Sequence, residues 1–264
     1  MLTLENTTVT FNEGTPDEKQ ALKPFDLSLK AGDFLTVIGG NGAGKSTLMN
    51  VISGMQIPDT GKVLIDDKDV TYEPEHKRST LIGRVFQDPM AGTAPSMTIE
   101  ENLAIAYARN KRRKLFPGVT KDRKEMFRTS LQTLNLGLED RLTAKVGLLS
   151  GGERQALSLL MATFTNPKIL LLDEHTAALD PERAQLITDL TKEIVAENEL
   201  TTIMVTHNMQ QALTLGNRLI MMDEGEVILR VEDEEKKQLT VEKLLKEFEK
   251  RRGSSLNHDQ VILA

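Results

Sequence analysis

The feature that most constrains this chain is a glycine-rich run at residues 39–47, with the sequence GGNGAGKST. It fits the pattern G-x-x-x-x-G-K-[ST], in which glycines let the backbone curl and turn its N–H groups inward around phosphate oxygens. Apolar residues 34–38 predict a buried strand before it, and residues 47–52 predict a helix after it, capped at Gly54. A glycine-rich turn that only resembles the motif is disfavoured by these two flanking elements.

The loop predicts a site for a nucleotide triphosphate at the start of that helix, where the helix dipole favours negative charge. We expect Lys45 to bridge the β- and γ-phosphates and the Ser46 hydroxyl to bind Mg²⁺. The residues expected to contact the nucleotide here are Gly39, Asn41, Gly42, Ala43, Gly44, Lys45, Ser46 and Thr47.

The composition excludes several classes of protein. The 264 residues are 39% hydrophobic, enough for a core, and no apolar run is long enough to predict a transmembrane helix. The first residues lack the basic and apolar regions of a secretory signal, and the absence of cysteine excludes disulfides and thiolate zinc sites. The net charge of −6 gives no support to nucleic-acid binding. A cytosolic protein is expected.

The rest of the chain alternates predicted strands with predicted helices. Further strands are predicted at residues 7–11, 25–29, 62–65, 81–86, 168–174 and 201–206. Residues 88–162 form a predicted all-helical insert, which contains a helix start with Thr98 as cap and Glu101 three residues later. A basic run at residues 109–114 is predicted to face solvent, and residues 240–252 to form a C-terminal helix. We expect a single domain over residues 1–264.

Three further stretches carry candidate chemistry. Asp173 and Glu174 end an apolar strand, where Asp173 can hold a metal's water shell and Glu174 can act as general base toward water. Ser150, Gly151 and Gly152 open a predicted helix and offer a second anion site, although this stretch taken alone favours a serine-capped helix start. His207 follows another strand, at the end where parallel strands converge on a nucleotide.

Together these stretches resemble the ATP-binding subunits of ABC transporters, in family order and over nearly the whole chain. The matching stretches are the Walker A loop at 39–47, the Q-loop residue Gln87, the signature at 149–155, the Walker B strand at 169–174, the D-loop at 178–180 and the switch histidine His207.

The resemblance implies an α/β fold: a P-loop NTPase core of mostly parallel sheet flanked by helices, an N-terminal antiparallel β subdomain and an inserted helical subdomain. It implies Mg²⁺-dependent ATP hydrolysis, with Gln87 at the metal or the attacking water and His207 at the γ-phosphate. Phe11 looks like the aromatic residue that stacks on adenine, although a core phenylalanine beside Val9 is an equal alternative. His175 stands where the family usually has proline and Ala177 where it often has serine; the sequence explains neither.

The implied partners are integral membrane permease subunits, a solute-binding protein indirectly, and a second copy of the chain, packed head to tail with ATP so that Ser150 and Gly152 reach the partner's γ-phosphate. This places the protein peripherally on the cytoplasmic face of the membrane. A GTPase is disfavoured because no N-K-x-D motif is present. An export ATPase and an ABC-type ATPase of DNA repair or translation stay open as alternatives, and the solute is not encoded in this chain. A scaffold that does not hydrolyse ATP is disfavoured by Lys45, Asp173, Glu174 and His207.

Overall fold

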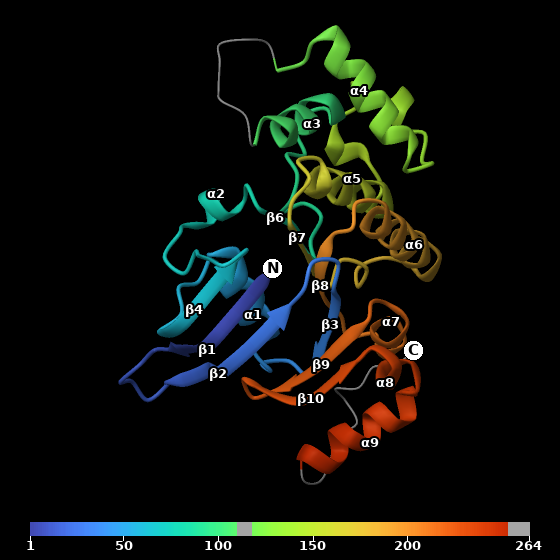
Figure 1. The fold of residues 1–264 in the computed structure, drawn as a ribbon. Coiled ribbons are helices and arrows are strands. Elements are labelled where there is room, and N and C mark those ends of the chain that lie inside the picture. Colours follow the sequence, from blue (N-terminus) through green and yellow to red (C-terminus); the bar gives the residue numbers. More distant parts are fainter. Residues whose placement is uncertain (110–117, 253–264) are drawn as a thin grey trace. The chain divides into compact units, whose positions relative to one another are not determined.

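The computed structural model describes residues 1–109 and 118–252. It divides into two compact units, one made of Met1–Arg78 with Thr201–Ala264 and the other of Ser79–Leu200. In Figure 1 the first unit carries the blue and red ends of the colour scale and the second its middle. Apart from Arg109, the basic run predicted at residues 109–114 lies outside the described residues.

The first unit contains a four-stranded antiparallel sheet in the order β2-β1-β4-β5. Its strands are β1 (Leu2–Phe11), β2 (Lys19–Leu29), β4 (Thr60–Ile65) and β5 (Lys68–Asp69). Phe25, Leu27 and Leu29 alternate into the core, as the sequence pattern predicts for a half-buried strand.

The first two strands are longer than predicted, for reasons that the backbone shows. β1 begins at Leu2. Asn6 has a left-handed backbone (φ 44°), but the pairing with β2 shifts register between Leu4 and Thr7, so the strand continues past Asn6. β2 begins at Lys19 although it contains Pro24. Because β2 is the edge strand of this sheet, the missing N–H of the proline removes no bond from the ladder.

The parallel part of the first unit is built around β3 (Phe34–Gly39). It lies between β8 (Thr201–Val205) and β9 (Arg218–Asp223), both parallel to it, and β10 (Glu226–Glu232) pairs antiparallel with β9. A strand enclosed in this way is buried on both faces, which explains why residues 34–38 are all buried and why four of the five are apolar.

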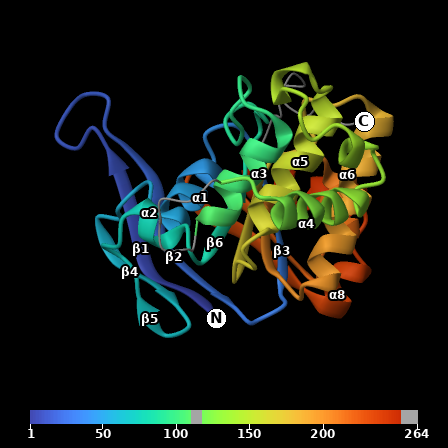
Figure 2. The same cartoon turned by 90° about the horizontal axis from the view of Figure 1, so that it is seen from above.

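Helix α1 (Lys45–Ser53) follows β3 and contacts both β2 and β3 (Figure 2). It ends at Gly54 in a left-handed cap (φ 82°), as predicted. The short helix α2 (Glu75–Arg78) completes the N-terminal part of this unit.

The C-terminal helices cover β9 and β10. They are α7 (Met209–Thr214), α8 (Asp233–Lys237) and α9 (Val241–Arg252). Leu244 and Phe248 of α9 join Leu219 and Met221 in one apolar cluster. The ammonium of Lys236 in α8 is buried, where it donates to the carbonyl oxygen of Leu215, and burial lowers its pKa to about 8.

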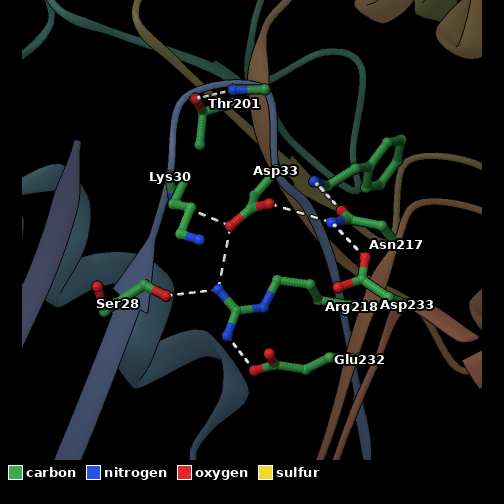
Figure 3. Close-up of polar contacts among 10 residues, drawn as sticks. Ser28, Lys30, Asp33, Thr201, Asn217, Arg218, Glu232 and Asp233 are labelled. Atoms are coloured by element: carbon green, nitrogen blue, oxygen red, sulfur yellow. Dashed lines mark hydrogen bonds and ion pairs between the residues drawn. The ribbon is translucent and has the colours of Figure 1, made fainter. Parts of the chain in front are cut away.

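Beside the start of β3, a network of polar side chains joins four strands (Figure 3). The Arg218 guanidinium lies 3.0 Å from the Asp33 carboxylate and also contacts Glu232, while the Asn217 amide donates to Asp33 at 3.0 Å. Burial alone would raise the pKa of Asp33, but the bonds from Asn217, the Lys30 N–H and Arg218 outweigh it and lower that pKa. The network fixes β3 relative to β2, β9 and β10 at the end of the strand far from the phosphate loop.

The second unit combines one parallel strand pair with helices. Strand β6 (Ile82–Val85) pairs with β7 (Ile169–Asp173). Its helices are α3 (Ile99–Ala108), α4 (Lys121–Gln132), α5 (Gly151–Thr163) and α6 (Pro181–Glu197), with short 3-10 turns at Leu138–Asp140 and Val146–Leu148. The predicted cap of Thr98 with Glu101 is present as a reciprocal pair of bonds.

Helix α5 packs closely on β6 and on its neighbouring helices. A Cβ on Gly83 would lie 2.4 Å from the Ala162 carbonyl oxygen, so only glycine allows this approach. Tyr107, Phe127 and Phe164 form a cluster of edge-on and tilted rings with centroids about 6 Å apart, which joins α3, α4 and the end of α5.

Candidate nucleotide site

The glycine-rich loop leaves β3 in a conformation that other residues could not adopt. A Cβ on Gly39 (φ 155°) would lie 2.3 Å from the Met222 carbonyl oxygen, and one on Gly44 (φ 100°) would lie 2.5 Å from that of Ala21. The loop is therefore clamped between β2 and the end of β9. The Gly225 N–H, in the turn after β9, also donates to the Ala43 carbonyl oxygen at 3.1 Å.

The start of α1 is suited to an anion. Gly44 occupies the cap position and has no side chain that could cap the helix, and the first turn contains no acidic residue. A helix start of this composition favours an external anion. The Lys45 ammonium is buried among the loop's own carbonyl groups, 2.8 Å from the Gly39 oxygen and 2.9 Å from that of Gly40, whereas the Ser46 side chain is exposed.

Strand register brings His207 to the same edge as this loop. Val37 of β3 pairs with Val205 of β8 in parallel. Two residues further on stand Gly39, the last residue of β3, and His207, which lies beyond the end of β8. The loop that carries His207 is held by the Thr206 hydroxyl, which accepts from the Asn208 N–H at 3.0 Å, and Asn208 then caps α7.

Phe11 is the last residue of β1 and is 41% exposed, whereas Val9 is completely buried. The alternative that Phe11 is a core residue beside Val9 is therefore wrong. Its exposed ring is available for stacking, and Lys19 stands opposite it across the strand pair.

In the second unit the same register argument joins Gln87 and Glu174. Val85 of β6 pairs with Leu172 of β7, and each candidate follows two residues later. Gln87 is exposed and Glu174 is half-buried, with a left-handed backbone (φ 45°) that is uncommon outside glycine. Strained residues of this kind gather at functional sites, which is consistent with a role for Glu174.

Asp173 has a partner that the sequence analysis missed. The Arg84 guanidinium lies 3.1 Å from its carboxylate, and the same guanidinium stacks over the Phe86 ring at 4.8 Å. Arg84, one position before the register pair Val85–Leu172, points to the same face as Asp173. The parallel pairing of β6 with β7 would have been needed to find this contact from the sequence.

His175 now has a structural explanation. Its ring is buried, and its Nε2 lies 3.1 Å from the Thr191 hydroxyl of α6. Because the Thr191 hydroxyl donates its one hydrogen to the Ile187 carbonyl oxygen at 2.7 Å, it accepts from His175, so Nε2 carries the ring hydrogen. Burial lowers the pKa of His175 to about 4, which keeps the ring neutral near pH 7.

The signature stretch has the geometry of a capped helix start. The Ser150 hydroxyl accepts from the Glu153 N–H at 3.3 Å, and the Glu153 carboxylate accepts from the Ser150 N–H at 2.7 Å. The capping interpretation is confirmed. The Ser150 side chain also hydrogen-bonds to the Glu153 carboxylate, so an anion would have to compete with Glu153 for the hydroxyl hydrogen. A Cβ on Gly152 would lie 3.1 Å from the Arg183 side chain, so α6 packs tightly here.

Oxygen donors of the kind that magnesium prefers occur in each unit. Mg²⁺ prefers hard oxygen ligands and usually takes only one or two carboxylates, the remainder coming from water and phosphate. The first unit offers the Ser46 hydroxyl, and the second offers the Gln87 amide and the Asp173 carboxylate. No cluster of three or more His, Cys, Asp or Glu side chains occurs in residues 1–109 and 118–252, so this part of the chain offers no separate all-protein metal cage.

These features define a P-loop ATPase, with a phosphate loop between strand and helix and polar groups beyond the carboxyl ends of parallel strands. The sequence profile of the ABC transporter family matches residues 22–177, more than half of the chain. The chain therefore belongs to the ABC transporter family, as an ATPase subunit that binds and hydrolyses ATP.

Individual relatives agree with this assignment. The tyrosine transport ATP-binding protein of Clostridioides difficile is 43% identical over 249 residues, which cover 94% of this chain and 99% of that protein. The spermidine/putrescine import ATP-binding protein PotA of Spiroplasma citri is 36% identical over 80% of this chain but only 57% of its own length. The dimeric ATP-binding cassette MJ0796, solved with ADP and Pi, superposes with a TM-score of 0.75 at 31% identity, over 88% of this chain and 98% of that one.

Proposed function

We propose that this chain powers solute uptake through a separate membrane permease, and that an amino acid is the solute class. The observation that carries the ATPase part is the loop between β3 and α1, in which Gly39 and Gly44 tolerate no side chain and Lys45 begins the helix. The uptake part is supported by the relatives described above, which are named for transport or import. This favours uptake over the export, repair and translation alternatives.

We assign the chemical roles as follows. The N–H groups of the loop and the Lys45 ammonium hold the β- and γ-phosphates, and Ser46, Gln87 and Asp173 serve the magnesium ion. Glu174 acts as general base toward the attacking water, and His207 contacts the γ-phosphate. Bound Mg²⁺ supplies neutralisation of the charge that develops on the phosphates.

The assembly we propose is an ATP-dependent homodimer on permease subunits, at the cytoplasmic face of the membrane. Dimeric cassettes among the structural relatives support the first element. In this dimer Ser150, Gly151 and Gly152 reach the γ-phosphate bound by the partner copy. No helix within the described residues is long and apolar enough to cross a bilayer, and this is compatible with a separate permease. A solute-binding protein would take part only through that permease.

We propose that the region around Gln87 docks on the permease. Crosslinking tests this docking face, because the chain contains no cysteine to interfere. Met90, just after Gln87, is 41% exposed, and Met90→Cys should crosslink to a cytoplasmic permease loop. Lys30→Cys, at the opposite end of β3 from the phosphate loop, is the matched control and should not. Crosslinks from position 30 alone would overturn the proposed docking face.

Uptake in cells tests the transport role directly. Cells in which Glu174→Gln replaces the wild-type chain should lose ATP-dependent uptake of a labelled amino acid from a panel that includes tyrosine. Unchanged uptake of every amino acid would overturn the proposed solute class, and ATP-dependent efflux instead would overturn the direction.

A further inference from the structure

We propose that Lys19 is an additional nucleotide-binding residue, whose ammonium contacts the α-phosphate of ATP. The inference rests on the nucleotide site proposed above and adds a residue outside the motifs found in the sequence. It concerns only the first unit, which holds the phosphate loop, Phe11 and Lys19.

The placement of Lys19 links the two ends of the nucleotide site. As the first residue of β2 it pairs with Phe11, the exposed last residue of β1. Its Nζ reaches the phosphate loop, because a Cβ built on Gly42 would lie only 3.2 Å from that nitrogen. The same strand approaches the loop again two residues later, where the Ala21 carbonyl oxygen faces Gly44. Lys19 therefore sits between the ring available for adenine and the loop that wraps phosphates.

The Lys19 ammonium also retains its hydrogen-bonding capacity. Within the described residues it makes no hydrogen bond or ion pair, although an ammonium has three donors. Other lysines of this region differ: Lys23, four residues along the same strand, lies 2.7 Å from the Glu226 carboxylate, and Lys45 is bound to two loop carbonyl groups. A cation without a counter-charge beside an anion-binding loop is suited to a charged ligand.

The position selects which phosphate is contacted. The loop and Lys45 are assigned to the β- and γ-phosphates, and the α-phosphate joins these to the ribose and the adenine. A cation between Phe11 and the loop therefore meets the α-phosphate. Because ATP and ADP both carry this group, Lys19 should strengthen the binding of both nucleotides by the same factor.

Equilibrium titration of the full-length chain with ADP and with a non-hydrolysable ATP analogue tests this. Lys19→Met should weaken both affinities about three- to tenfold, the range expected between an exposed ion pair and a charge-assisted hydrogen bond. Lys19→Arg should restore most of the loss, and the difference from wild type should shrink in high salt, because the pair is solvent-exposed. Lys23→Met, the matched control, should leave both affinities unchanged.

The outcomes separate this inference from the proposed nucleotide site. If Lys19→Met changes neither affinity while Lys45→Ala weakens ATP binding, the loop binds the nucleotide and the Lys19 inference is wrong. If only the ATP analogue is affected, Lys19 contacts the γ-phosphate and the α-phosphate assignment is wrong. If Lys45→Ala also has no effect, the proposed site itself fails.

Discussion

Arg78 is the residue whose replacement should destabilise the first unit most, and it belongs to no motif. Its side chain is completely buried and donates to four carbonyl oxygens. The acceptors are Val51 at 2.7 Å, Ile52 at 3.0 Å, Thr71 at 2.7 Å and Glu73 at 3.0 Å. The guanidinium thereby ties the C-terminal end of α1, where the helix dipole is negative, to the segment after β5.

The magnitude follows from the acceptors that Arg78→Met leaves behind. Methionine fills a similar volume but donates no hydrogen bond, so four carbonyl groups lose a partner. The bond to the Glu73 oxygen is only partly buried, and the Val51 oxygen still accepts from the Gly54 N–H. Each orphaned acceptor costs about 1–3 kcal/mol, and part of this is offset because a buried charge is removed, the same burial that lowers the pKa of Arg78. We expect a net loss of about 3–5 kcal/mol, a large share of the roughly 5–15 kcal/mol that stabilises a typical protein.

Urea unfolding followed by circular dichroism measures this loss, with hydrogen exchange to locate it. The amides of α1 should exchange faster in Arg78→Met before the chain unfolds as a whole. Lys77→Met removes an exposed neighbouring charge and should shift the unfolding free energy by less than about 0.5 kcal/mol. A loss below about 1 kcal/mol in Arg78→Met would refute the reasoning, because it would mean that water replaces the guanidinium at no cost.

Three further predictions concern catalysis, nucleotide binding and pH. Glu174→Gln should retain ATP binding but slow hydrolysis by about 10²–10⁴-fold, the usual contribution of a general base; turnover within threefold of wild type would argue against that role. Lys45→Ala should weaken ATP binding more than ADP binding in equilibrium titrations, because its ammonium is assigned to the γ- as well as the β-phosphate, and equal losses would contradict that assignment. Lys236 has a pKa of about 8 in the folded chain, against 10.5 for the free side chain. Between these two pH values the unfolded chain binds more protons than the folded chain. The free energy of unfolding therefore rises with pH, by up to about 3 kcal/mol. Unfolding in urea at pH 7.5 and 9.5 should therefore reveal a rise in wild type that Lys236→Met lacks, and parallel curves would disprove it.

Local signals in the sequence predicted local structure well. The caps at Thr98, Ser150 and Gly54 depend on residues within one turn, so the pattern alone was sufficient. The sequence also placed the candidate polar residues at strand ends, because each lies just beyond an apolar run, but it did not give the pairing or register of the strands. Phe11 could not be decided, since its exposure depends on how β1 ends against β2.

Long-range partners of buried charges were not predictable in this way. Arg78 reaches carbonyl groups 26 and 27 residues earlier in the chain, and Lys236 reaches the Thr36 hydroxyl at 3.2 Å across 200 residues. In the sequence both look like ordinary surface residues of charged segments. Only the folded chain reveals that the charged ends of these two side chains donate hydrogen bonds to buried backbone carbonyl groups.

His175 illustrates how a departure from a family pattern can keep the geometry that the pattern serves. A proline at this position would restrict the backbone after Glu174 by its ring, whereas His175 restricts it through a buried hydrogen bond to Thr191. The restraint matters because Glu174 holds a left-handed backbone, which costs free energy unless its neighbours fix it. Since the imidazole is neutral near pH 7, it can do so without placing a second cation beside Asp173, where Arg84 already lies. A hydrogen bond from His175 to Thr191 therefore takes the place of the restraint that a proline ring would give. Because the imidazole is neutral, the charge near the Asp173 carboxylate is unchanged.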